Sequence, residues 1–95
     1  MKETQPIDSR TVEIINRKSP GIENLAITLK VSDLTRAKTD KGESCVGYGM
    51  QHGIPIIADT ATGKGLAFPQ RDMRIFMDAA AKGHFKPLAK MMRGE

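Results

Sequence analysis

The chain has 95 residues, which is enough for one globular domain and too few for two. Apolar residues make up 39% and charged residues 27%, a balance that excludes a disordered chain, while the lack of Trp predicts a thin core. The net charge of +4 is mild for a nucleic-acid-binding protein. We expect a single domain over residues 1–95, with a loosely ordered N-terminus at about 1–8 and a C-terminal tail at about 86–95.

The sequence also bears on location. Residues 1–6 lack the apolar stretch of a secretory signal, and no apolar run reaches the roughly 20 residues of a membrane span. Cys45 is the single cysteine, so no intramolecular disulfide can form. We therefore expect a cytoplasmic protein that does not bind membranes.

Two segments of the first half have strand-like patterns. Residues 11–16 are rich in β-branched side chains and favour a strand, although Asp8 or Ser9 could cap a short helix there. A turn follows at Ser19-Pro20-Gly21. Residues 25–31 alternate with a period of two, which predicts a half-buried strand with one apolar face made of Leu25, Ile27, Leu29 and Val31.

The middle of the chain predicts further strands. The polar stretch 35–44 is expected to be a loop. Residues 45–50 alternate again, with Val46, Tyr48 and Met50 on one face and two bare glycines on the other. After a turn at 51–53, residues 54–59 predict a strand that lies at an edge or begins after Pro55, because Pro55 cannot donate to a ladder. A turn over 60–65 then leads to a short strand at 66–68.

The pattern changes to a helical one after Pro69, which is suited to a first helical turn. One apolar stripe follows at helical spacing and is expected to face the core: Met73, Phe76, Met77 and Ala80. Gly83 provides a left-handed cap, and Phe85 could fold back onto the helix. Residues 86–95 predict either a short helical turn or a ragged tail. The fold class expected is α+β, with a small antiparallel sheet or partly open barrel of three to five strands followed by one C-terminal α-helix.

Few residues are candidates for chemistry. Gly63-Lys64-Gly65 lacks the spacing of a phosphate-binding loop and is better read as a turn. Cys45, His52 and His84 do not form the paired spacing of a zinc site. Asp59 ends a predicted strand and favours a turn-forming role over a buried functional carboxylate. We therefore predict no catalytic, cofactor-binding or metal-binding residues, no cofactor, and no enzymatic activity.

From Ser44 to Phe85 the chain resembles the BldB-like family of short actinobacterial regulatory domains. The shared pattern is a cysteine with an alternating strand, a strand ending in Asp and a small hydroxyl residue, a Leu-x-Phe strand, and a helix closing on Gly-x-Phe. In this chain the elements are Cys45-Val46-Gly47-Tyr48, Ile56-Ile57-Ala58-Asp59-Thr60, Leu66-Ala67-Phe68, and the helix that leads to Gly83-His84-Phe85.

The chain departs from the family pattern at three places: residues 36–38 replace a usual Trp, Met73 replaces an aromatic, and Ala58 replaces an Arg. Residues 1–35 have no counterpart. The resemblance implies a regulator without a DNA-binding domain of its own, often encoded beside helix-turn-helix regulators and active in developmental or antibiotic-production control. We expect a homodimer that binds such a helix-turn-helix partner. The alternative is a small basic protein that binds nucleic acid as a dimer.

Overall fold

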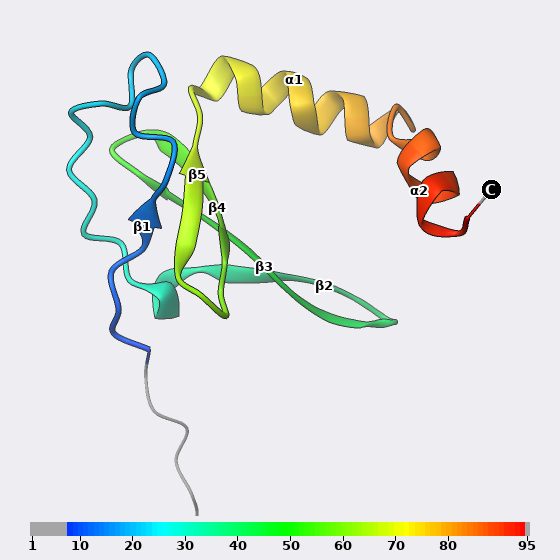
Figure 1. The fold of residues 1–95 in the computed structure, drawn as a ribbon, viewed down its shortest axis with the longest axis horizontal. Coiled ribbons are helices and arrows are strands. Elements are labelled where there is room, and N and C mark those ends of the chain that lie inside the picture. The colour runs from blue at the N-terminus through cyan, green and yellow to red at the C-terminus, as the bar shows by residue number, and fades with distance from the viewer. Residues whose placement is uncertain (1–7, 95) are drawn as a thin grey trace, which may run out of the picture.

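The computed structural model describes residues 8–94, so the expected loose N-terminus lies almost wholly outside the described residues. The described chain is an α+β domain, as predicted, with five strands in one open sheet (Figure 1). The sheet order is β1-β5-β4-β3-β2, and β1 runs parallel to β5 while the other pairs are antiparallel. The sheet is therefore mixed rather than purely antiparallel, and it is not closed into a barrel. The strands are β1 Glu13–Ile14, β2 Thr35–Thr39, β3 Gly42–Gln51, β4 Ile54–Asp59 and β5 Lys64–Ala67.

Three helical elements accompany the sheet. A 3-10 turn, η1, covers Val31–Asp33. The helix predicted after Pro69 is α1, Gln70–Ala81, and a second helix, α2, covers Lys86–Met92. The C-terminal region 86–92, for which a tail and a short helical turn were both open, is therefore helical. Gly83 has the left-handed φ of 78° expected of a helix cap.

The β3–β4 hairpin sets the centre of the sheet. Its two turn residues, His52 and Gly53, both have positive φ (53° and 75°), which matches the twist of a tight hairpin. The prediction that β4 lies near an edge is wrong, because β4 pairs with β3 and β5. Pro55 is tolerated there because β5 ends at Ala67, so no ladder bond is required from the backbone nitrogen of Pro55. The Pro55 carbonyl still accepts a hydrogen bond from Phe68 N at 3.2 Å.

The prediction of a loop over 35–44 is also wrong, since β2 and the start of β3 form a hairpin there. Every side chain of β2 is exposed, so the segment carries no apolar alternation that sequence reading could detect. The ladder depends on backbone bonds at the sheet edge, where Thr35 pairs with Tyr48 and Thr39 with Gly42.

The strand predicted at 25–31 does not join the sheet, yet its alternation is real. Leu25, Ile27 and Leu29 are half-buried, and the residues between them are exposed. The backbone is held at scattered points: Val12 N donates to Leu29 O at 2.8 Å, and Gln51 Oε1 accepts from Thr28 N and Leu29 N at 2.9 and 3.1 Å. The segment is an extended strap across one face of the sheet. Beneath it lies the core, formed by Val12, Ile14, Ile22, Val31, Ile56, Ala58 and Ala67.

Glycines on this face of the sheet allow the core elements to approach closely. A Cβ on Gly65 would lie 2.8 Å from Ala58 Cβ and 3.0 Å from Ile57 O, which are rigid neighbours. A Cβ on Gly49 would meet only the flexible ends of Leu29 and Leu34, at 3.1 and 3.2 Å.

We predict that Gly65→Ala lowers the free energy of unfolding by about 1–3 kcal/mol, because a clash with backbone and Cβ atoms forces the strands to shift. Gly49→Ala is the matched variant and should cost less, since leucine ends can rotate away. Urea denaturation of both variants at one protein concentration measures the difference. Equal losses would contradict the packing described here.

Candidate functional site: an open apolar groove beside α1

The second face of the sheet lacks the strap that covers the first. Cross-strand partners share a face, so Tyr48 and Ile57 stand side by side on it, as do Met50 and Pro55. The alternation predicted for residues 45–50 is confirmed, with the glycines turned toward the core and the large side chains turned away. Only α1 crosses this face, where it packs on β4.

The helix α1 buries little of its apolar stripe. Met73 is 7% exposed and contacts the sheet, whereas Phe76 and Met77 are 48% and 55% exposed. The prediction that Phe76 and Met77 lie in the core is therefore wrong. The physical reason is that a single short helix over one strand presents only its central line to the sheet, and no element covers its flanks.

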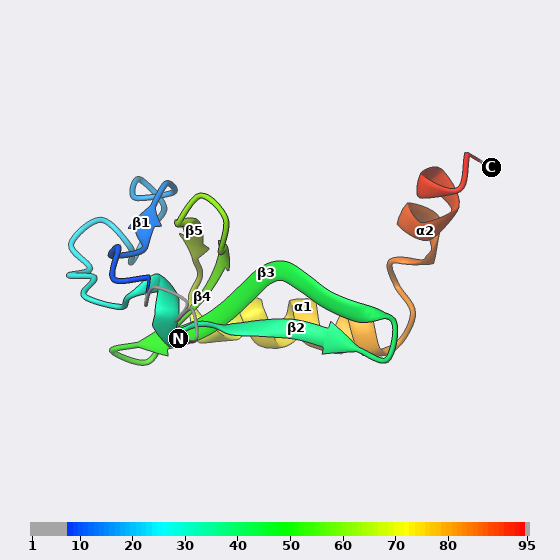
Figure 2. The ribbon, with the colours of Figure 1, turned by 90° about the horizontal axis from the view of Figure 1, so that it is seen from below.

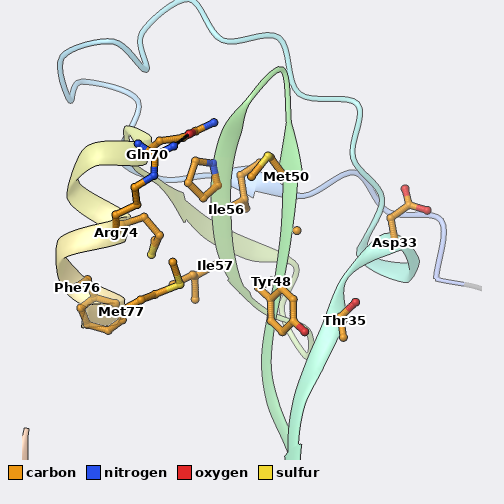
Figure 3. Close-up of a pocket in the computed structure, with 13 residues that line it drawn as sticks. Asp33, Thr35, Tyr48, Met50, Ile56, Ile57, Gln70, Arg74, Phe76 and Met77 are labelled. Atoms are coloured by element: carbon orange, nitrogen blue, oxygen red, sulfur yellow. Dashed lines mark hydrogen bonds between the residues drawn. The ribbon is translucent and has the colours of Figure 1, made fainter. Parts of the chain in front are cut away.

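A groove of about 680 Å³ lies between α1 and strands β2–β4 (Figure 3). We call it the α1 groove. Polar groups enter only at its margins, from Asp33, Thr35, Gln70 and Arg74. Its remaining lining is Tyr48, Gly49, Met50, Pro55, Ile56, Ile57, Met73, Phe76 and Met77. A second hollow, of about 490 Å³, lies on the other side of α1 over β5.

The α1 groove is open to solvent along apolar side chains. Tyr48, Met50, Phe76 and Met77 are each between 48% and 57% exposed, and Figure 3 shows them on facing walls. Contiguous apolar surface of this kind on a small domain marks a site of interaction. Two of the four are methionines, whose flexible, polarizable side chains adapt to different partners.

The polar margin positions α1 more than it offers chemistry. Gln70 Nε2 donates to Gly53 O at 2.8 Å and ties the start of α1 to the β3–β4 turn. Arg74 Nη2 donates to Gln70 Oε1 at 2.5 Å, so the guanidinium continues this link. The hydrogen bond from Gln70 therefore joins the first turn of α1 to the β3–β4 turn at one margin of the groove, and the bond from Arg74 lies within the helix.

The candidates for metal or nucleophilic chemistry do not meet. Cys45 and His52 lie seven residues apart on one continuous strand and turn, which separates them by about 23 Å at 3.3 Å per residue. Cys45 is exposed, and its Sγ accepts a long contact of 3.8 Å from Arg36 Nη2. His84 lies beyond the end of α1, against Phe85. Within residues 8–94 no group of three His, Cys, Asp or Glu side chains could hold a metal ion.

Asp59 forms the turn that was predicted for it. Its Oδ1 accepts from Ala61 N at 2.9 Å and its carbonyl accepts from Gly63 N at 2.8 Å, so the carboxylate shapes the β4–β5 connection. Gly63 lies in this connection, as predicted, whereas Lys64 and Gly65 already belong to β5, so the turn predicted over 60–65 ends two residues earlier.

Arg10 braces the same connection from outside. Its guanidinium donates to both carboxylate oxygens of Asp8, and this hydrogen bonding lowers the pKa of Asp8 below its usual value. Nη2 also approaches Thr60 O and Ala61 O at 3.4 Å. This exposed cluster joins the N-terminal part of the described chain to the β4–β5 connection and contributes no residue to the α1 groove.

Sequence reading found both walls of the α1 groove but not the groove. The sequence predicts an apolar face for residues 45–50 and another for the helix after Pro69, and it predicts burial in the core only for the helix stripe. The sequence does contain a signal for the groove, because it has more apolar faces than segments that could cover them. The strap covers one side of the sheet, and α1 is left to cover the other.

Comparison with known proteins adds no assignment: no family model matches the chain, and no curated protein or solved structure matches it. Among the described residues, no helix has the length and apolar character needed to cross a membrane. The fold and the groove define a small α+β domain with an open apolar surface.

Proposed function

We propose that this protein is a non-enzymatic regulator that acts by binding another protein through the α1 groove. The observation that carries the proposal is the row of half-exposed apolar side chains, Tyr48, Met50, Phe76 and Met77, along a groove of about 680 Å³. A groove of this form suits the apolar face of an amphipathic helix, which anchors through side chains at i, i+3 and i+4.

The partner proposed is a helix-turn-helix transcription regulator in developmental or antibiotic-production control. This part rests on the resemblance of residues 44–85 to the BldB-like domains, and such regulators present amphipathic helices. The protein would act in the cytoplasm as a homodimer, and binding in the groove would change what the regulator can contact.

The test is a calorimetric titration of this protein with a purified helix-turn-helix regulator, chosen from those encoded beside its gene. We predict that Met50→Lys weakens binding by at least about tenfold, because a charge replaces an apolar contact in the groove. Ile15→Lys is the matched control, since Ile15 is 60% exposed on the β1 side and outside the groove lining. Equal affinity of both variants, with unchanged melting temperatures, would refute the groove as the binding site.

One observation favours nucleic-acid binding as a second candidate. Residues 82–94 contain four Lys or Arg and no Asp or Glu, so this segment alone carries a net charge of +4, the same as the whole chain. A dimer would present two such segments to a phosphate backbone.

We nevertheless expect no sequence-specific binding of duplex DNA by the protein alone. The helix α2, which follows α1 after residues 82–85, has only 7 residues and exposes Leu88, Met91 and Met92 instead of the polar side chains that read base edges. Mobility shifts at physiological salt, with random-sequence competitor, measure this. Discrimination of one sequence from the competitor would favour the second candidate, and a steep loss of affinity with added salt would assign it to phosphate contacts.

A further inference from the structure

The helix α2 has an apolar stripe that nothing in the described chain covers. Leu88, Met91 and Met92 stand at i, i+3 and i+4, and they are 52%, 67% and 76% exposed. No residue of α2 is buried. In both overall views α2 lies beyond the far end of α1, away from the sheet (Figures 1 and 2). We call residues 84–94 the arm.

The direction of the arm is fixed where it leaves α1. Gly83, with φ of 78°, ends the helix, and His84 N donates to Ala79 O at 2.9 Å. The ring of Phe85 then packs on Phe76 with 5.2 Å between centroids. These contacts direct α2 away from the α1 groove of its own chain, so a return to that groove would break both the cap and the ring contact.

We propose that the arm of one copy lies in the α1 groove of a second copy, and that the exchange is reciprocal. The two surfaces match in kind: an amphipathic helix with anchors at i, i+3 and i+4 on one side, and an open apolar groove with flexible walls on the other. A two-fold axis relates the copies, so each donates one arm and receives one.

The area agrees with what a stable dimer needs. Four groove residues (Tyr48, Met50, Phe76, Met77) and three arm residues (Leu88, Met91, Met92) each expose about half of their surface or more. At roughly 100 Å² apiece they offer about 700 Å² per copy, close to the ~800 Å² that each partner gives to a standard interface.

Charge neither drives nor opposes the exchange. The lining of the α1 groove carries one acid and one base, Asp33 and Arg74, while Lys86 and Lys90 lie beside the apolar stripe of α2, on the side that would face solvent. We therefore expect the dimer to depend on apolar contact, with a dissociation constant that changes little between low and high salt.

The inference rests on the proposed function, because the arm would occupy the same groove that a partner helix uses. Arm and partner then compete, and the dimer is the form in which the groove is closed. Removal of the arm should give a monomer with an open groove and a stronger affinity for the partner.

The deciding experiment is complementation, read by sedimentation equilibrium at tens of micromolar. Met91→Asp with Met92→Asp disables the arm, and Met50→Asp with Met77→Asp disables the groove. We expect each double variant to be monomeric, with the dimer dissociation constant raised by roughly 100-fold or more. An equimolar mixture should form a heterodimer through the one intact arm and the one intact groove. Ile15→Asp is the control and should remain dimeric.

Several results would overturn the exchange. They are a monomeric wild type, a dimeric arm variant, a dimeric groove variant, and a mixture that does not associate. A dimeric arm variant beside a monomeric groove variant would indicate two grooves packed face to face. The truncated chain ending at Gly83 separates this inference from the proposed function. If truncation leaves the dimer intact but the regulator still binds, the exchange is wrong and the function stands. If truncation gives a monomer that does not bind the regulator, the exchange stands and the function is wrong.

Discussion

Replacement of Ile56 by alanine is expected to leave the protein only marginally stable at 25 °C. Ile56 is fully buried at the centre of β4, where the strap and β1 converge on the sheet. Removal of three methyl or methylene groups from such a site costs about 2–5 kcal/mol, the transfer free energy plus the cavity left behind. A domain of this size has a total stability of about 5 kcal/mol, at the low end of the usual range. Urea denaturation measures the effect.

Two variants calibrate that result. Ile56→Val should cost only about 0.5–1.5 kcal/mol, because one methylene is lost from the same site. Phe76→Ala should cost about 1–2 kcal/mol, since the ring is half-exposed and contributes its partial burial and its contact with Phe85. All variants are compared at one protein concentration, because the proposed self-association would make the apparent stability depend on concentration. A larger loss for Phe76→Ala than for Ile56→Ala would contradict the placement of the core.

The elements predicted most accurately are those whose local pattern and tertiary role coincide. The alternation in 45–50, the strand at 54–59, the turn at 51–53, and the helix after Pro69 are all present. Each of these patterns is strong because one side of the element is apolar and the turn residues adopt positive φ without strain.

The failures have a different origin. The segment 25–31 alternates as a strand does, because it lies extended on an apolar surface, and alternation reports burial on one side rather than ladder bonds. The opposite case is β2, which forms a ladder with every side chain in water and therefore leaves no pattern. Backbone pairing at a sheet edge depends on tertiary structure, and it leaves no pattern in the side chains of the sequence.

The candidate site was missed for a related reason. The apolar stripe Met73, Phe76 and Met77 predicts a buried helix face, and only Met73 is buried. Local periodicity identifies a face that avoids water but not the element that covers it. Here the sheet is too narrow beneath α1 to cover both flanks, and the uncovered flank forms the α1 groove with Tyr48 and Met50. A face without a covering element within its own chain is the physical basis of the interaction proposed above.

The side chain of Asn16 extends the sheet where the backbone of β1 has ended. The strand β1 covers only two residues, yet its edge continues through an amide clamp on β5. Asn16 Nδ2 donates to Ala67 O at 2.7 Å, and Asn16 Oδ1 accepts from Ala67 N at 2.9 Å. Ala67 is fully buried, so both of its backbone groups depend on this side chain for a partner on that edge.

Asn16→Ala is therefore expected to lower the free energy of unfolding by about 2–6 kcal/mol, because an unsatisfied buried donor or acceptor costs about 1–3 kcal/mol and two are created. Asn16→Asp keeps an acceptor for Ala67 N but sets a carboxylate against Ala67 O, so it should not restore stability. Asn24→Ala, at an exposed turn position, is the control and should change stability by less than about 0.5 kcal/mol. Urea denaturation gives the totals, and amide hydrogen exchange gives the location: the Ala67 amide should lose protection first in Asn16→Ala. A wild-type exchange rate at Ala67 in that variant would show that the clamp does not hold the end of β5.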